Sequence, residues 1–285
     1  MTMKKLFILL LAVFTCYSCS GPKHDKRPML TVSIEPLRFV VEAIVGDKYQ
    51  VKTLMPQGVS PETYDPTPRQ MVELSNSEIL FCAGTINFEQ QKIPQLASSI
   101  PHLSIVNLGE HVATITDHNH KHGDEAESID PHIWMSPQNL KTMAQNVCHY
   151  MCFTHPSDSV YYEERLSMFE KRMDKLDQSL RVILQSLRTR SFLIYHPALG
   201  YFAKQYGLNQ LSVEFDGKDP SAAYFQQLIN LCKADHVNAV FISKEHNGRA
   251  AQRIATEINA ETYTINPLDY DIEKQLLTIA KILKQ

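Results

Sequence analysis

Three residues that are far apart in the sequence have side chains typical of transition-metal ligands. Glu62 is in a loop after a predicted strand, His132 is in the motif Asp-Pro-His-Ile-Trp, and His196 directly follows an apolar strand. Two neutral imidazoles and a carboxylate suit a divalent transition ion, because they replace its water shell and offset part of its charge. Asp130 is placed to orient the His132 ring by accepting a hydrogen bond. Taken singly, Glu62 also fits a surface acid, and each histidine also fits a capping or core role.

A second group of metal-capable side chains lies in the polar segment 117–125, which reads DHNHKHGDE. Its three histidines, His118, His120 and His122, follow no apolar period, so we predict a mobile loop. Flexible clusters of histidine and carboxylate bind zinc loosely, which suits an auxiliary collector beside a tighter site. The alternative is a solvated insertion with no metal-binding role.

The apolar pattern predicts an α/β fold of two similar lobes with mostly parallel sheets, because strand-like runs alternate with helical runs in both halves. Strands are expected at 30–34, 49–54, 78–83 and 104–107 in the first half and at 192–195, 210–215, 239–243 and 262–265 in the second. In open sheets of this kind, ligands bind beyond the carboxyl ends of the strands. Glu62 and His196 follow such ends, which predicts a metal cleft between the lobes.

One long, rigid helix is predicted to join the two halves. From Leu166 to Leu187 the apolar residues step alternately by three and four, and no Gly or Pro interrupts 157–190. A helix of roughly 30 residues would be about 45 Å long and would hold the lobes at a fixed separation. A coiled-coil dimer is the competing interpretation, but it needs more heptads than this segment has, so we expect a monomer.

Composition limits the classes of partner and the roles of the cysteines. The net charge is −3 at pH 7 with acidic and basic residues interleaved, so no nucleic-acid-binding surface is expected. Four cysteines lie in apolar or helical patterns and lack the paired spacing of a zinc site, so we expect buried free thiols instead of disulfides or zinc ligands. They are Cys82, Cys148, Cys152 and Cys232.

The N-terminus has the pattern of a secretory signal. Lys4 and Lys5 precede an apolar run at 6–14 that is too short to span a membrane. The sequence Cys-Tyr-Ser-Cys-Ser-Gly that follows resembles a bacterial lipoprotein cleavage site, so we expect a lipid on Cys19, with secretion without lipid as the alternative. The predicted divisions are a signal peptide at 1–18, a lipidated tether at 19–29, an N-terminal lobe at 30–156, a linking helix at 157–190 and a C-terminal lobe at 191–285.

A series of motifs from about Thr31 to the C-terminus resembles the metal-receptor subunits of bacterial zinc and manganese ABC importers, in particular the ZnuA-like group. The motifs are VGD at 45–47, LMPQG at 54–58, PETYDPTP at 61–68, DPHIWM at 130–135, YHPALGYF at 195–202, DPS at 219–221 and NPL at 266–268. The resemblance implies two α/β lobes joined by one long helix with the metal between them. It also implies capture of a divalent metal on the periplasmic side or at the cell surface, and delivery to a membrane permease.

Two positions depart from the pattern of that group, which usually has His at the position of Glu62 and Asp at the position of Asn266. The resemblance implies Glu62, His132 and His196 as metal ligands. The fourth ligand is then the amide oxygen of Asn266, the nearby Asp269, or water. Two histidines and two oxygens suit Mn²⁺ or iron as well as Zn²⁺. The histidine-rich loop and the general order of affinities both favour zinc.

Two other classes of function fit parts of the sequence. A zinc hydrolase can use a His-His-Glu set with an open fourth position, but there is no His-Glu-x-x-His motif and no evident general base, so we do not expect an enzyme. An adhesin or scaffold with a structural metal is the other alternative. Such a protein collapses when its metal is removed, whereas a receptor stays folded and exchanges the metal.

Overall fold

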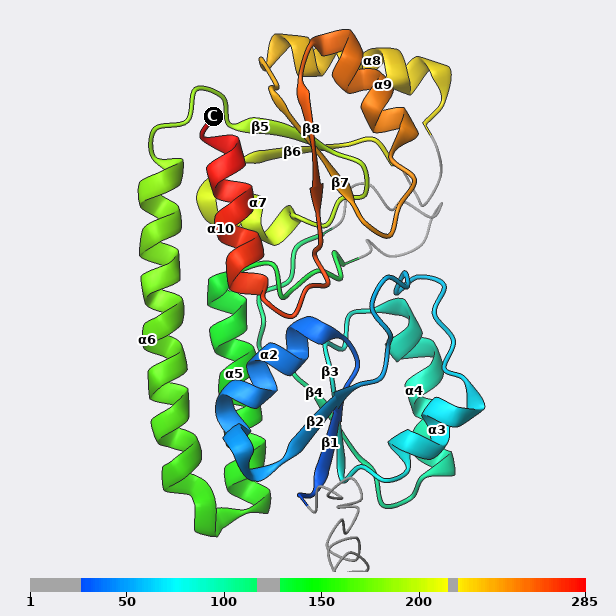
Figure 1. Ribbon diagram of the computed structural model, residues 1–285, viewed down its shortest axis with the longest axis vertical. Coiled ribbons are helices and arrows are strands. Elements are labelled where there is room, and N and C mark those ends of the chain that lie inside the picture. The colour runs from blue at the N-terminus through cyan, green and yellow to red at the C-terminus, as the bar shows by residue number, and fades with distance from the viewer. Residues whose placement is uncertain (1–26, 117–128, 215–219) are drawn as a thin grey trace, which may run out of the picture.

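The computed structural model describes residues 27–116, 129–214 and 220–285, which form two α/β lobes stacked along one long axis (Figure 1). The predicted lipid attachment site Cys19 and the histidines His118, His120 and His122 lie outside these ranges. Within the described ranges, no helix combines the length and the apolar character that a membrane crossing requires.

The N-terminal lobe contains a four-stranded parallel sheet in the order β2-β1-β3-β4. Every residue of β3 is buried, as expected for a central parallel strand with helices on both faces. The strands are β1 Met29–Val32, β2 Gln50–Thr53, β3 Ile79–Cys82 and β4 Ser104–Asn107. The helices are α2 Glu35–Val45, α3 Pro68–Leu74, α4 Asn87–Ser99 and α5 Pro137–Thr154, with a short 3₁₀ turn at Gly46–Lys48.

The C-terminal lobe repeats this arrangement in a second four-stranded parallel sheet, in the order β6-β5-β7-β8. The strands are β5 Ser191–Ile194, β6 Asn209–Ser212, β7 Ala239–Ser243 and β8 Glu261–Ile265. The helices are α7 Gly200–Tyr206, α8 Ala222–Ala234, α9 Arg249–Ile258 and α10 Ile272–Leu283. In each lobe the first strand lies between the second and the third, which confirms the prediction of two similar lobes with parallel sheets.

The loop between β2 and α3, which carries Glu62, is fixed at both ends. The Tyr64 hydroxyl and the Gln70 side chain both donate to the Leu54 carbonyl, at 2.9 and 3.0 Å. Thr67 begins α3 with a reciprocal cap, in which the Gln70 backbone N–H donates to the Thr67 hydroxyl and the Gln70 side chain accepts from the Thr67 N–H. The tip of this loop is therefore held over the carboxyl edge of the sheet.

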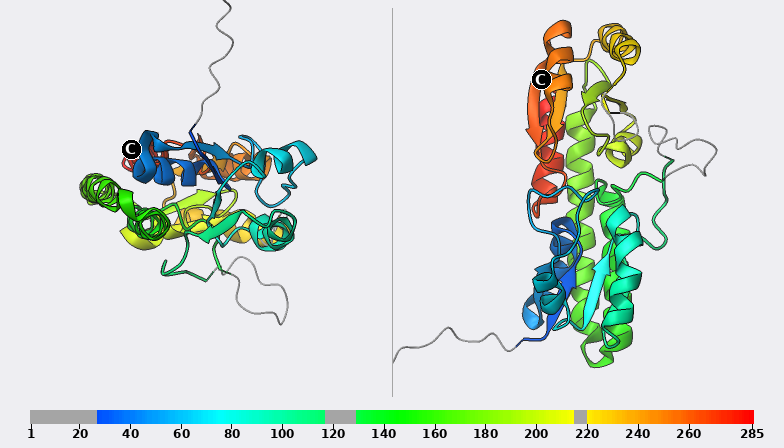
Figure 2. Two further views of the ribbon diagram at one scale, coloured as in Figure 1. Left: turned by 90° about the horizontal axis from the view of Figure 1, so that it is seen from below. Right: turned by 90° about the vertical axis from the view of Figure 1, so that its right-hand side faces the viewer.

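The long helix α6, Ser159–Leu184, runs beside both lobes and follows a short 3₁₀ turn at Pro156–Asp158 (Figures 1 and 2). Its buried side chains pack against α2 and α5 of the first lobe and against α10 of the second. They are Tyr162, Phe169, Met173, Leu176, Leu180 and Leu184. This spacing of mostly three, four and seven residues confirms the long helix that joins the lobes.

The helix ends earlier than the predicted boundary at residue 190. After Leu184 the chain turns toward β5, and Thr189 and Arg190 bond to the C-terminal lobe: the Thr189 hydroxyl donates to the Asp235 carbonyl and the Arg190 guanidinium to the Tyr206 carbonyl. Leu187 still packs against the core. The apolar period therefore continued past the helix because the following turn is also packed against the core.

The loop after β8 ties the two lobes together. The Trp134 indole N–H donates to the Pro267 carbonyl at 2.8 Å, and the Tyr270 hydroxyl donates to Glu42 Oε2 at 2.7 Å. Arg172 of α6 forms an ion pair with Glu273 of α10 at 2.6 Å. One hydrophobic core cluster also contains residues from both lobes. The lobes are therefore packed against each other as well as joined by α6, which favours small movements over wide hinge opening.

The four described cysteines are free thiols, as predicted. Cys82, Cys148 and Cys232 are buried, and Cys152 is half-buried. Burial raises the pKa of the Cys232 thiol to about 11 and that of the Cys148 thiol to about 12. Neither value favours the thiolate, which is the form that binds metal.

Candidate metal centre

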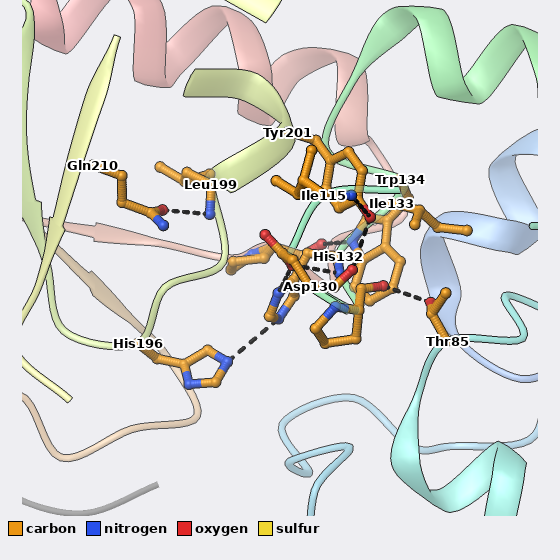
Figure 3. Close-up of polar contacts among 12 residues, drawn as sticks. Thr85, Ile115, Asp130, His132, Ile133, Trp134, His196, Leu199, Tyr201 and Gln210 are labelled. Carbon is orange, nitrogen blue, oxygen red and sulfur yellow. Dashed lines mark hydrogen bonds and ion pairs between the residues drawn. The ribbon is translucent and has the colours of Figure 1, made fainter. Parts of the chain in front are cut away.

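His132 and His196 meet between the two lobes with their ring nitrogens facing each other (Figure 3). His132 precedes α5 of the first lobe, and His196 follows β5 of the second. Their Nε2 atoms are 3.3 Å apart, and both residues are buried. In a tetrahedral zinc site with Zn–N bonds of 2.0–2.1 Å, two ligand nitrogens are about 3.3 Å apart. The spacing of this pair therefore matches two neighbouring corners of a tetrahedral site.

Each of these histidines is oriented by a buried carboxylate on the other side of its ring. His132 Nδ1 and Asp130 Oδ1 are 2.9 Å apart, and His196 Nδ1 and Glu214 Oε2 are 2.8 Å apart. An ionised carboxylate only accepts hydrogen bonds, so each Nδ1 carries a hydrogen, and in a neutral ring the Nε2 atom then presents a lone pair. Two lone pairs that face each other at this distance repel, and a metal ion or a proton between them removes the repulsion. This is the pattern of metal-ligating histidines with carboxylate partners.

The Asp-Pro-His motif is held in place from both lobes. The Asp130 side chain also accepts from the His132 backbone N–H at 2.9 Å, and the Tyr201 hydroxyl donates to the Asp130 carbonyl at 2.9 Å (Figure 3). A Cβ atom on Gly200 would lie only 2.2 Å from Asp130 Oδ2, so a larger residue there would displace the Asp130 carboxylate. The Trp134 and His132 rings pack in a T-shaped arrangement, with centroids 5.4 Å apart. The C-terminal lobe thus helps to position a candidate ligand of the N-terminal lobe.

Glu62 also reaches this centre, but from a different side of His196. Its Oε1 atom is 3.5 Å from His196 Nδ1, the nitrogen that already bonds to Glu214. The Glu62 side chain is 43% exposed and comes from a loop tip. It is therefore free to change rotamer when an ion binds, whereas the two buried carboxylates are fixed by their histidines.

A third histidine, His246, belongs to the same cluster and was missed in the sequence. Its ring stacks on that of His196 with centroids 4.5 Å apart and an interplanar angle of 10°. Glu62, His196 and His246 offer ligand atoms that all lie within 4.8 Å of one another. Burial, together with the neighbouring His196, lowers the pKa of the His246 imidazole, which favours the neutral form that binds metals. His246 lies three residues beyond β7, at the edge where His196 follows β5. Its position just after a predicted strand was the signal in the sequence that could have identified it.

Asn266 and Asp269, the other two residues considered for the fourth position, bond within their own loop. Asn266 Oδ1 accepts from the Leu268 N–H at 3.1 Å, and Asn266 Nδ2 donates to Asp269 Oδ2 at 3.3 Å. Asp269 also accepts from the Asp271 N–H. Among the described residues, no polar contact joins Asn266 or Asp269 to the histidines. Their role as ligands stays a prediction.

The two orienting carboxylates give a first testable prediction. Asp130→Asn and Glu214→Gln each keep the side-chain shape, but an amide can donate to Nδ1 and so allow the tautomer with the hydrogen on Nε2. We therefore expect each variant to weaken zinc affinity by about 10- to 100-fold. Competition with a chromophoric chelator measures this. Asp235→Asn is the matched control, because Asp235 accepts a hydrogen bond from Ser191 at the opposite end of β5. Equal losses in all three variants would mean that the effect is not specific to the histidine partners.

Comparison with known proteins places this chain in one family. The family profile described as "Zinc-uptake complex component A periplasmic" matches residues 30–283. The "High-affinity zinc uptake system protein ZnuA" of Bacillus subtilis (strain 168) is 26% identical over 258 residues, which cover 87% of this chain and 80% of that protein.

Solved structures agree with the family match. A crystal structure of ZnuA has a TM-score of 0.85 and 30% sequence identity, and the match covers 91% of this chain and 98% of that one. A ZnuA deletion mutant with zinc bound has a TM-score of 0.83, again at 30% identity, with 91% and 97% covered. The chain therefore belongs to the ZnuA family of periplasmic zinc-uptake components.

Proposed function

We propose that this protein is an extracytoplasmic receptor that captures a divalent transition metal, zinc first, and delivers it to the membrane permease of an ABC importer. The observation that carries the proposal is the pair of Nε2 atoms 3.3 Å apart, one from each lobe, with each ring held by a buried carboxylate. A metal ion between the rings would accept a lone pair from each Nε2 atom. The zinc-uptake names of the similar proteins support the same function.

The proposed ligands are Glu62, His132 and His196, with an additional oxygen or nitrogen ligand to complete the shell. Glu62 lies near His196 and has enough exposure to move toward the ion. An exposed carboxylate beside two buried imidazoles suits reversible binding, because it can leave first when the metal is released. The tentative fourth ligand Asn266 and its neighbour Asp269 lie in the loop after β8. If either of them binds the ion, the shell contains two nitrogen and two oxygen ligands.

The centre is less suited to a hydrolase than to a receptor. A hydrolytic zinc site needs a water molecule on the metal and a general base beside it. The carboxylates of Asp130 and Glu214 are buried and already bonded to the histidine Nδ1 atoms, so neither is placed to act as that base. We therefore propose that the protein is not an enzyme. The structural-metal alternative is disfavoured because a large apolar core packs the two lobes without involving the ligands.

The remaining parts of the chain fit delivery at a membrane. We propose that Cys19 carries the lipid anchor on the periplasmic side or cell surface, that the protein acts as a monomer, and that His118, His120 and His122 form an auxiliary zinc-collecting loop. The partner is then the importer permease. Because the lobes are tied by Trp134 and Tyr270, we expect only a small closure when the metal binds.

Metal analysis of protein purified without added metal tests the proposal. We expect about one tightly held zinc ion per chain, in a tetrahedral nitrogen and oxygen environment. Stripping that ion with a chelator should leave the circular dichroism spectrum unchanged, and zinc should rebind. A protein that binds no divalent transition metal would contradict the receptor function. Unfolding on metal removal would support the structural-metal alternative, and hydrolytic turnover that depends on Glu62 would support the enzyme.

A further inference from the structure

We infer that His246 is a fourth protein ligand of the same ion, and that its imidazole makes the site selective for zinc over manganese. This inference rests on the proposed function. It extends the ligand set from two imidazoles to three, and it assigns the additional position to the loop after β7 instead of the loop after β8.

The first support is the state of the His246 ring nitrogens. Both Nδ1 and Nε2 are buried, and neither has a hydrogen-bond partner among the described residues. A neutral imidazole has one N–H donor and one lone pair, and burying either without a partner is costly. A histidine that serves only as core packing normally has at least one nitrogen bonded. A metal ion would bind the free lone pair, which leaves only the ring N–H without a partner.

The second support is where the backbone places this ring. Strands β5 and β7 are neighbours in the sheet, so the residues that follow them lie at the same edge. The His246 N–H donates to the Ser243 carbonyl at 3.1 Å, which turns the chain directly after β7. Gly248 lets the chain pass close to Ile242, since a Cβ atom at Gly248 would lie 2.4 Å from Ile242 Cγ2. The tight turn brings the His246 ring onto that of His196.

The third support is the position of the ring relative to the proposed ligands. A stack of 4.5 Å puts His246 beside His196, and Glu62, His196 and His246 offer ligand atoms within 4.8 Å of one another. The His246 ring then has to rotate out of the stack to aim its lone pair at an ion on His196. His196 is therefore close to every other proposed ligand: its Nε2 faces His132, its Nδ1 lies 3.5 Å from Glu62, and its ring stacks on His246. Glu62 has to change rotamer to reach an ion on Nε2. In contrast, the Asn266 amide bonds within its own loop. Of the two loops, the one after β7 is better placed to complete the shell.

Three imidazoles and one carboxylate have a different metal preference from two imidazoles and two oxygens. Nitrogen ligands suit zinc, whereas carboxylate and amide oxygens suit manganese, and zinc also has the greater intrinsic affinity for mixed sites. The sequence left zinc, manganese and iron open because only two histidines were assigned. The third imidazole shifts that balance to zinc.

X-ray absorption at the zinc edge tests the ligand directly in the intact chain. We expect an imidazole signature corresponding to about three histidines in the wild type and about two in His246→Ala. The wild-type spectrum alone is informative, so the test does not depend on the variant folding. A wild-type signature of two imidazoles that His246→Ala leaves unchanged would overturn the inference.

Competition between zinc and manganese tests the selectivity. We expect His246→Ala to lose about 10- to 100-fold in zinc affinity. His246→Asp should lower the zinc-to-manganese affinity ratio by at least about tenfold, because an oxygen ligand replaces an imidazole. His149→Ala is the matched control, because His149 is exposed on α5. Asn266→Ala tests the competing assignment in the loop after β8, and we expect it to lose less zinc affinity than His246→Ala.

The outcomes separate this inference from the proposed function. If His246→Ala binds zinc as the wild type does while His196→Ala loses it, the inference is wrong and the receptor function stands. If Asn266→Ala loses affinity and His246→Ala does not, the fourth ligand lies in the loop after β8. If the wild type binds neither metal, the proposed function fails together with the inference.

Discussion

Replacing His196 with alanine should weaken zinc binding by more than about 100-fold, because loss of an orienting partner alone costs about 10- to 100-fold and this change removes a ligand itself. His196 contacts the other two histidines, Glu62 and the buried carboxylate of Glu214. No other residue of the cluster has so many of these contacts. Chelator competition at fixed pH measures the affinity, and zinc-edge absorption measures the change in coordination.

This variant needs a control for folding, because it leaves the buried Glu214 without its histidine partner. Loss of that pairing destabilises the protein even without a metal. The metal-free forms of His196→Ala and wild type should therefore be compared by thermal unfolding before any affinity is interpreted. His149→Ala provides the matched histidine control, since His149 is exposed on α5. Zinc affinity in His196→Ala within about threefold of that control would contradict the metal centre.

Most of the fold could be predicted from local patterns, because both lobes are built from parallel strands that alternate with amphipathic helices. The apolar runs at 192–195 and 239–243 became the central strands β5 and β7. Their carboxyl ends then defined the edge at which a ligand was expected. The end of α6 was less predictable, because Leu187 continues the apolar period in a turn that packs against the core.

The candidate site was predictable where a motif constrains the backbone and unpredictable where only tertiary packing does. The Asp130 carboxylate accepts from the His132 ring, as its position two residues earlier indicated. Glu214 was not identified as the partner of His196, because it belongs to the loop after a different strand. His246 was missed for the same reason: the residues around it form no motif, and its meaning depends on β5 and β7 being neighbours.

The prediction of Asn266 as a fourth ligand had a limit of a different kind. Asn266 was considered because the ZnuA-like group usually has Asp at its position, and a sequence resemblance alone cannot show how its amide is used. In the structure, both ends of that amide are bonded to Leu268 and Asp269. A residue can thus lie at the expected edge of the sheet and still make its hydrogen bonds within its own loop.

The largest expected effect on stability is in α6. Leu180 is fully buried in the core cluster that both lobes share, so Leu180→Ala should lower the free energy of unfolding by about 2–5 kcal/mol. Urea unfolding of the metal-free protein measures this change. Val182, two residues along the same helix, is 64% exposed, so Val182→Ala should change stability by only about 0.5 kcal/mol or less.

The form of the unfolding curve tests whether α6 unites the lobes or only connects them. Because the core cluster that contains Leu180 includes residues of both lobes, weakening it should shift one cooperative transition and not separate two. Zinc at about 100 times its dissociation constant should then raise the free energy of unfolding by about 2.7 kcal/mol in wild type and in Leu180→Ala alike, since Leu180 is not a proposed ligand. Two resolved transitions in Leu180→Ala, with zinc stabilising only one of them, would mean that each lobe folds alone and that the ion does not bind between two lobes packed as one unit.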